Sequence, residues 1–209
     1  MRPALAVILL LCVTLGGCAA VNLVTRQPPE LYALTPKTTF DADLPDPGRA
    51  ILRIETPTAA AGLNTTRIPL KPTPTRLQYY AGATWVEVLP LMVQNLVIES
   101  FESTGRVEAL GPGATGGLAE WALRIYIREF QAEYDERTDE PPVVRARLQA
   151  RLLRMPRREE VDFADFATEA PAPSARLDDI VDTMDGALGT TMRDLVEWTV
   201  RRIAELERA

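Results

Sequence analysis

Residues 144–152 read Val-Arg-Ala-Arg-Leu-Gln-Ala-Arg-Leu, and this alternation decides the fold class. Successive side chains of a β-strand point to opposite faces, so the stretch predicts a strand with one core face and one basic, solvated face. Residues 123–134 also alternate, but their apolar phase slips by one between Ile127 and Phe130, which predicts a bulge. Residues 161–168 are expected to form a third strand of the same meander.

Two helices are predicted around this meander. The first runs from about Val88 to Thr104, with Pro90 in its first turn and Gly105 after its last residue. Ser174 is a candidate N-cap for a long final helix. The final helix has apolar positions that step by three and four, namely Leu177, Ile180, Val181, Met184, Leu188, Met192, Leu195, Thr199, Ile203 and Leu206.

The first half of the chain contributes shorter strands. We expect strands at 31–34, 50–54, 77–81 and 106–110. Prolines crowd residues 56–75, so only a short irregular or edge strand around 66–70 is expected there. This order of elements predicts an α+β domain, with a mixed, largely antiparallel sheet and two main helices packed on one face.

Composition removes several classes of function. The 209 residues carry a net charge of -6, so no global positive field attracts nucleic acid. The sequence has no histidine, which excludes Ser-His-Asp and Cys-His catalysis and histidine-ligated metal sites. No pair of carboxylates stands out as catalytic, and we expect no enzyme activity.

The N-terminus has the plan of a signal peptide. An apolar run from Ala4 to Leu15 is too short to span a bilayer, which takes about 20 residues. The following Leu15-Gly16-Gly17-Cys18 resembles the bacterial lipobox, whose cysteine receives S-diacylglycerol and then an N-acyl group after cleavage. An ordinary secretory signal with a chance cysteine is the alternative.

The lipobox divides the chain into three parts. Residues 1–17 are the predicted signal peptide, 18–29 the lipidated N-terminus and tether, and 30–209 a single α+β domain. Cleavage removes Cys12, so no disulfide is expected and the acyl groups on Cys18 are the only expected modification, with no cofactor. Several acyl chains at one residue give firm membrane anchorage. By analogy with enterobacterial sorting rules, Ala19 in place of an aspartate after the cysteine suggests the outer membrane, on the periplasmic side of a Gram-negative envelope.

Several motifs in this order resemble the ABC-type transport auxiliary lipoproteins, the family that includes PqiC. They are the lipobox, Leu31-Tyr32-Ala33-Leu34, Tyr79-Tyr80 shortly before Trp85, a helix that ends Phe101-Glu102-Ser103-Thr104-Gly105-Arg106, the alternating hairpin, and Trp198 in the last helix. The start of that helix, Val181 to Ala187, departs from the aromatic-and-alanine pattern expected in the family. The departure weakens any transfer of a particular interface to this helix.

The resemblance implies an accessory subunit without catalysis. Its implied partners are a periplasmic MCE-domain protein and an ABC permease with its ATPase, which move lipids between the inner and outer membranes. Two alternatives stay open: a lipid-binding periplasmic carrier, and a structural lipoprotein of another envelope machine. A homo-oligomer is also open.

Two groups of residues are candidates for partner binding. Tyr79, Tyr80 and Trp85 are aromatic, as interface anchors often are, but we favour the alternative that they seal the edge of the core. Arg145, Arg147 and Arg151 could meet phosphates or an acidic partner. For these arginines we favour cross-strand pairing with Glu129, Glu133 or neighbouring acids.

Two further features receive no functional role. Asp178, Asp182 and Asp185 share one helix face, but three carboxylates on a straight helix surround an ion poorly, so we expect a solvated acidic face and no metal. Residues 111–117 are glycine-rich but lack the Gly-Lys-Ser/Thr ending of a phosphate-binding loop. They are expected to form a plain loop.

Overall fold

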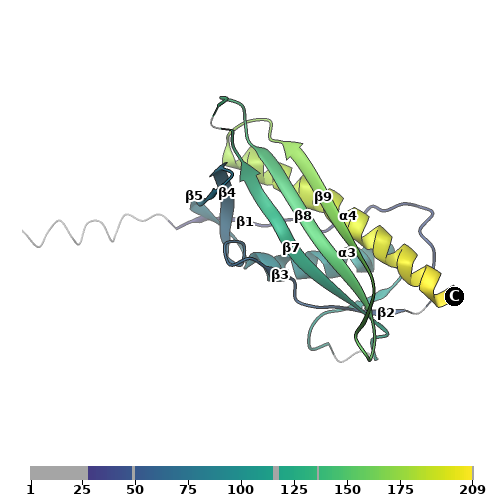
Figure 1. Cartoon of the computed structure of the whole chain (residues 1–209). Coiled ribbons are helices and arrows are strands. Elements are labelled where there is room, and N and C mark those ends of the chain that lie inside the picture. The colour runs from purple at the N-terminus through teal and green to yellow at the C-terminus, as the bar shows by residue number, and fades with distance from the viewer. Residues whose placement is uncertain (1–27, 49, 115–117, 136, 209) are drawn as a thin grey trace, which may run out of the picture. The chain divides into compact units, whose positions relative to one another are not determined.

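The structure is a computed structural model that describes residues 28–48, 50–114, 118–135 and 137–208. The chain divides into a unit that ends at Glu30 and a compact unit from Leu31 to Ala209, which is the subject below. Its elements are shown in Figure 1. In chain order they are β1 (Glu30–Tyr32), β2 (Ile51–Ile54), β3 (Thr58–Ala59), β4 (Arg67–Thr73), β5 (Arg76–Trp85), α3 (Leu89–Thr104), β6 (Glu108–Leu110), β7 (Trp121–Glu133), β8 (Val143–Arg154), β9 (Glu159–Pro171) and α4 (Leu177–Arg208).

Strand β7 organises the nine-stranded sheet. Along one edge it pairs with β8 over nearly its whole length, antiparallel. Along its other edge, three short strands follow one another, all parallel to it: β2 beside residues 121–123, β3 beside 126–127 and β4 beside 132–133. The sheet is therefore mixed, and its longest ladders, β7–β8 and β8–β9, are antiparallel.

The alternation in residues 144–152 does place one side of β8 in the core. Ala146, Leu148 and Ala150 are at most 1% exposed, whereas the arginines between them lie on the other face. The bulge is also present, because the register between β7 and β8 shifts between Ile127 and Glu129. The predicted α+β class, with its mixed sheet, is confirmed.

Strand β4 corrects the prediction of a short edge strand. It lies between β5 and β7 and runs for seven residues despite Pro69 and Pro72. A proline donates no hydrogen bond to a ladder, so interior strands normally exclude it. Here the ladder is interrupted instead: β4 and β5 shift register on either side of the Pro69–Leu70 pair of residues, and β7 pairs only with Leu70 and Lys71.

Helix α3 begins and ends as its sequence predicts. Pro90 occupies the first turn, where the missing N–H costs no helical hydrogen bond. At the other end, Gly105 adopts a left-handed conformation with φ of 62° and its N–H donates to the carbonyl of Glu102 at 3.0 Å. A residue without a Cβ is favoured in this conformation.

Helix α4 begins two residues later than a Ser174 N-cap would require. The N–H of Ile180 donates to the carbonyl of Arg176, so Arg176 occupies the N-cap position. Ser174 instead accepts a hydrogen bond from the Arg176 N–H at 3.0 Å, and its hydroxyl donates to Asp179 in the first turn. The serine thus stabilises the turn that leads into the helix rather than capping it.

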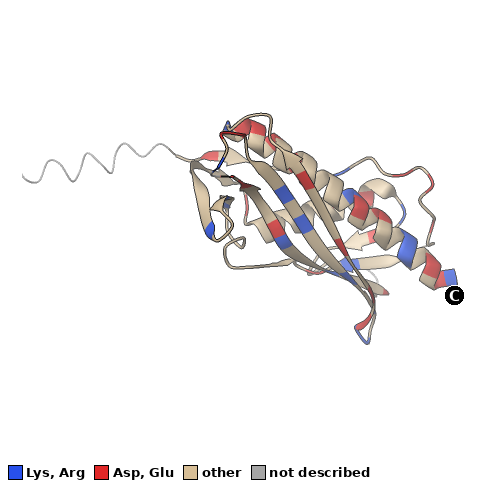
Figure 2. Ribbon diagram, turned by 45° about the horizontal axis from the view of Figure 1, so that its top comes forward, with Lys and Arg blue, Asp and Glu red and all other residues tan. Residues whose placement is uncertain are grey.

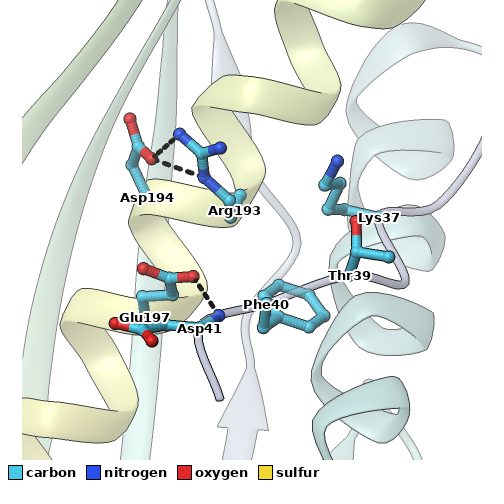
Figure 3. A pocket seen from close by; sticks show the side chains of 7 residues that line it. All are labelled: Lys37, Thr39, Phe40, Asp41, Arg193, Asp194 and Glu197. Carbon is cyan, nitrogen blue, oxygen red and sulfur yellow. Dashed lines mark hydrogen bonds and ion pairs between the residues drawn. The ribbon is translucent and has the colours of Figure 1, made fainter. Parts of the chain in front are cut away.

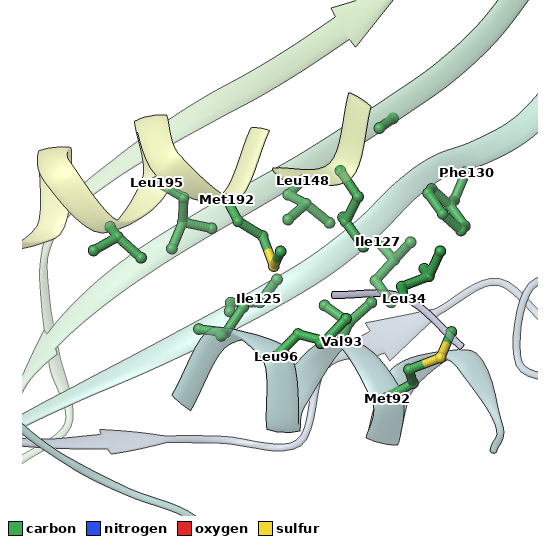
Figure 4. Close-up of a cluster of buried hydrophobic side chains, with 14 of the residues drawn as sticks. Leu34, Met92, Val93, Leu96, Ile125, Ile127, Phe130, Leu148, Met192 and Leu195 are labelled. Atoms are coloured by element: carbon green, nitrogen blue, oxygen red, sulfur yellow. The ribbon is translucent and has the colours of Figure 1, made fainter. Parts of the chain in front are cut away.

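Both helices pack on the same face of the sheet and share one core with it. Figure 4 shows Met192 and Leu195 of α4 and Leu96 of α3 pointing toward Ile125 and Ile127 of β7. All five side chains are at most 6% exposed. Burial of apolar side chains contributes about 1.5–3 kcal/mol each, so this layer is the main source of stability.

Polar and aromatic contacts then orient α4 on β9. Thr191 donates its hydroxyl to the Thr168 hydroxyl at 2.9 Å, and Trp198 packs edge-on against Phe166 with ring centroids 5.8 Å apart. In Figure 1, α4 accordingly runs along β8 and β9.

Candidate functional site

The sheet surface that points away from both helices, here called the open face, carries the three candidate arginines of β8. The Arg145 Nε lies 2.7 Å from Glu133 Oε2, and the same guanidinium contacts Glu169 of β9. Arg147 Nη2 lies 3.4 Å from Asp165 Oδ1, and Arg151 Nη1 2.8 Å from Glu160 Oε2. Figure 2 shows basic and acidic positions side by side on β7, β8 and β9.

These contacts are the cross-strand pairs that we favoured for the arginines. Each of the three guanidiniums neutralises at least one carboxylate on a neighbouring strand, so the open face is not the basic surface that β8 alone suggests. The acids come mainly from β9, which is an edge strand of the sheet, and charged side chains on an edge discourage pairing with foreign strands.

Glu133 is the most connected acid of the open face. Its Oε1 receives hydrogen bonds from Lys71 Nζ at 3.3 Å and Gln131 Nε2 at 2.9 Å, while Oε2 faces Arg145. Desolvation raises the pKa of the Glu133 carboxyl, but the hydrogen bonds from Gln131 and Lys71 and the nearby positive charges outweigh it. The net pKa therefore lies below the usual glutamate value.

The aromatic candidates separate into core and surface. Trp85 is 1% exposed and packs against Phe130 with centroids 5.9 Å apart, so it belongs to the core and is withdrawn as a partner-binding residue. Tyr80 is half-buried and shares a 2.9 Å hydrogen bond with the Tyr134 hydroxyl. Burial, followed by this hydrogen bond, raises the pKa of the Tyr80 hydroxyl.

Tyr79 is held at the surface of β5. Its hydroxyl donates to the Gly62 carbonyl at 3.0 Å, and the Arg67 guanidinium lies 3.6 Å above its ring. The structure does not bring the tyrosines together with the arginines of β8: Tyr79 and Tyr80 lie on β5, which is separated from β8 by β4 and β7.

Cys18, the predicted lipid attachment residue, lies outside the described residues, as do the signal peptide and most of the predicted tether. Within the described part of the chain, no helix has the length and apolar character needed to cross a membrane. No group of three or more potential metal ligands occurs among the same residues.

A pocket of about 450 Å³ opens between residues 37–41 and α4 (Figure 3). Arg193 binds its neighbour Asp194 at 2.9 Å, and the Asp41 N–H donates to Glu197 at 2.8 Å. The side chain of Lys37 makes no ion pair with another described residue. The lining is thus mostly charged, with Lys37, Thr39, Phe40, Asp41, Arg193, Asp194 and Glu197.

Residues 35–41, here called the strap, form the floor of this pocket and join both helices. The strap donates the Lys37 N–H to the Ser100 hydroxyl of α3 at 2.9 Å. It is bound to α4 at two places more than three turns apart, through Asp185 at Thr35 and through Glu197 and Arg201 at Asp41. Sequence patterns missed the strap because it has neither helical nor strand periodicity.

The strap and the strand before it also give partners to the acidic face of α4. Asp185 accepts hydrogen bonds from Thr35, and Asp178 accepts one from the Tyr32 hydroxyl at 2.7 Å. Only Asp182 keeps the expected solvated character, since it is exposed and makes no hydrogen bond or ion pair with another described side chain.

Comparison with known proteins places this fold. Residues 32–196 match the family described as ABC-type transport auxiliary lipoprotein component. The crystal structure of protein XCC0632 from Xanthomonas campestris, of the DUF330 family, has a TM-score of 0.75 and 25% identity, covering 85% of this chain and 97% of that one. A second solved structure, of an uncharacterized protein, has a TM-score of 0.62 at 12% identity and covers 83% of this chain and 99% of its own; it shows the shared fold alone.

A search of the curated proteins found no relative of this chain. The family match nevertheless covers the sheet and most of α4, and so includes the open face and the strap. The order of strands, helix, meander and helix that resembled these lipoproteins in the sequence lies within the matched range, whereas the lipobox lies before it. The chain belongs to the family of ABC-type transport auxiliary lipoprotein components.

Proposed function

We propose that this chain is a lipid-anchored accessory subunit of an ABC transporter that works with an MCE-domain protein to move lipids between the inner and outer membranes. The family match over residues 32–196 carries the proposal, and the sequence Leu15-Gly16-Gly17-Cys18 supports it. In this proposal the mature protein is anchored on the periplasmic side, at the outer membrane, through acyl groups on Cys18. The domain then binds its partner while it is held at the membrane surface.

Tethering is the physical basis of this role. Attachment at Cys18 confines the domain to within about 12 residues of chain from the bilayer, or roughly 40 Å when fully extended. Confinement of this kind raises the effective concentration of the domain for a partner that reaches the same surface. No chemical step is required of the protein.

The open face is the proposed docking surface. It combines the paired arginines with two aromatic side chains, Tyr126 beneath Arg128 and the 59% exposed Phe163 opposite Arg151. Exposed aromatics among arginines are typical of protein interfaces. Each ion pair on this exposed face contributes little to stability, so charged groups of a partner can replace one member of a pair at low cost.

A lipid carrier is less well supported. A carrier would surround an acyl chain with apolar side chains, but the pocket between the strap and α4 is lined mostly by charged groups. The space between helices and sheet is filled by the core side chains of Figure 4.

The test is crosslinking in intact cells, followed by purification through a C-terminal tag and mass spectrometry. Photo-crosslinkers at Phe163 on the open face and at Leu91 on the outer side of α3 form a matched pair, since both side chains are exposed. Capture of an MCE-domain protein and an ABC permease from position 163, with little from 91, supports the proposal. Capture of a different envelope machine, or co-purified lipid alone, contradicts it.

The anchor is tested separately with Cys18→Ala. This variant should leave the membrane pellet after a high-salt wash while its domain keeps the same unfolding midpoint. If it stays in the pellet, the lipid-anchor mechanism is wrong.

A further inference from the structure

A second pocket, of about 390 Å³, lies at the end of the sheet where β2 meets the loop after β6 and the turn between β8 and β9. Three charged residues line it. Arg53 lies in β2, Glu55 directly follows β2, and Arg158 lies in the turn between β8 and β9. Pro112 and Gly113 close it on the side of the loop. These residues come from three distant parts of the sequence, so no motif announces the pocket.

The only acid among the described residues of this lining is already occupied. Glu55 Oε2 lies 2.9 Å from Arg124 Nε, and Glu55 Oε1 lies 2.5 Å from Arg158 Nη2. The Glu55 side chain is 20% exposed, so both contacts are partly shielded from water. The single negative charge of Glu55 therefore neutralises only one of the two positive charges of Arg124 and Arg158, and this cluster keeps a net charge of +1.

Arg53 adds a second positive charge that has no partner among the described residues. It is half-buried, and its side chain makes no hydrogen bond or ion pair with any other residue in the described ranges. Partly burying a guanidinium costs desolvation energy that only an anion or an acceptor would offset. Arg53, Arg124 and Arg158 against Glu55 give a local charge of about +2 in a chain whose net charge is -6.

Arg158 is also held in an uncommon backbone conformation. Its φ is 58°, which makes it the one residue other than glycine with positive φ in the described part of the chain. Side chains with a Cβ rarely adopt this region, where glycine and asparagine are more usual. The hairpin turn between β8 and β9 accounts for this conformation, and the guanidinium of Arg158 contacts Glu55 at the pocket.

The position of the pocket bears on the source of its ligand. The Tyr32 hydroxyl binds Asp178 in the first turn of α4, so Tyr32 lies near that end of the helix. Arg154, just before the turn that carries Arg158, binds Glu207 in the last turn of α4. At about 1.5 Å per residue, these two ends of α4 are roughly 45 Å apart. Tyr32, near the start of the compact unit, thus lies at the end of α4 opposite the pocket, which favours a protein over the anchoring membrane as the source.

We propose that this pocket binds a carboxylate from an acidic segment of a partner protein, bridged between Arg53 and Arg158. Guanidinium groups bind carboxylates through paired, charge-assisted hydrogen bonds, which suits an open pocket with two arginines. The proposal rests on the proposed partner-binding function and names the chemistry by which one contact is made.

The test measures binding of a dye-labelled tetraglutamate peptide, acetylated and amidated at its ends, to the purified full chain by fluorescence anisotropy. Arg53→Gln should weaken binding about tenfold, because hydrogen bonds to charged groups contribute at that level. Arg157→Gln is the matched control: it removes the same charge one residue from Arg158, from an exposed side chain that does not line the pocket. Arg158→Asn should weaken binding equally while relaxing the positive φ, so loss of folding cannot explain it.

Two further probes separate the sources of an anion. Inorganic phosphate, and vesicles that contain phosphatidylglycerol, are tested with the same variants. Peptide binding that depends on Arg53 and falls with added salt supports the proposal. Equal losses in Arg53→Gln and Arg157→Gln, or Arg53-dependent binding of the vesicles without the peptide, overturn it.

The pocket and the proposed function can fail independently. If crosslinking in cells recovers the transporter equally well with Arg53→Gln, the pocket proposal is wrong and the function stands. If the unaltered chain recovers no transporter, the proposed function fails, and the peptide measurement still decides whether the pocket binds carboxylates.

Discussion

Thr35 donates its backbone N–H and its hydroxyl to the two carboxylate oxygens of Asp185, at 2.6 and 2.7 Å. The two residues are 150 positions apart in the sequence, so this contact joins the strap, near the start of the domain, to α4 at its end. Removing the carboxylate should therefore loosen a segment that also contacts α3 at Ser100.

Asp185→Ala should lower the free energy of unfolding by about 1–2 kcal/mol, because two hydrogen bonds to a charged acceptor are lost at a site open to water. Thr35→Ala should cost less, since it keeps the backbone hydrogen bond. Asp182→Ala, on the same helix face, is the control and should change stability by less than about 0.5 kcal/mol. Urea unfolding measures all three, and equal values for 182 and 185 would show that the strap adds no stability.

Two glycines should respond to alanine in opposite directions. Gly105 has φ of 62° at the end of α3, where a Cβ is strained whatever the free space, so Gly105→Ala should destabilise by about 1 kcal/mol. Gly186 is inside α4, and beyond the neighbouring residues and the backbone of its own helix a Cβ there would meet no atom within 4 Å. Gly186→Ala should therefore stabilise by about 0.5–1 kcal/mol through helix propensity. Thermal unfolding with shifts of the same sign for both would contradict this account.

Local sequence periodicity predicts which face of each strand or helix is buried. Particular residues show where such a prediction fails. The alternation around Ala146 and the phase slip before Phe130 predicted β8 and the β7 bulge, because both depend on neighbours along one strand. The rule against proline failed at Pro69, because it assumes an uninterrupted ladder, and β4 interrupts its ladder at that point.

Contacts between residues far apart in the sequence could not be predicted from local patterns. The spacing of Asp178 and Asp185 correctly places both on one helix face, but nothing near them reveals that Tyr32 and Thr35 lie there. Likewise, Glu55 and Arg158 are 103 positions apart, and only the folded sheet brings them together. The arginines of β8 were easier, because a strand rich in one charge implies acids on the strands beside it.

The Glu133 carboxyl should make the free energy of unfolding depend on pH in the acidic range. Its pKa in the folded protein lies below the usual 4.5, so its contribution is present above about pH 4.5 and is lost as pH falls through the lowered pKa. Glu133→Gln removes that contribution at neutral pH, by about 1 kcal/mol for a partly exposed cluster. Its unfolding free energy should then fall less steeply than that of the unaltered chain below pH 4.5.

The control for this titration is Glu169→Gln, which also removes an acid bound to Arg145 but from the more exposed side of the cluster. Its stability curve should stay close to that of the unaltered chain. If Glu133→Gln and the unaltered chain run parallel from about pH 6 to about pH 3, Glu133 does not hold its proton differently in the folded state.

The contact between Trp198 and Phe166 should show coupling beyond the area that each ring buries. Their edge-on geometry, with centroids 5.8 Å apart and planes at 61°, is one that aromatic pairs favour. A double-mutant cycle with Trp198→Leu and Phe166→Leu should give an interaction energy of about 0.5–1.5 kcal/mol. Because β9 is an edge strand and α4 its main cover, this energy should appear chiefly as slower hydrogen exchange of β9 amides. A coupling near zero, with unchanged exchange in β9, would mean that the hydrophobic contacts of α4 alone hold the strand in place.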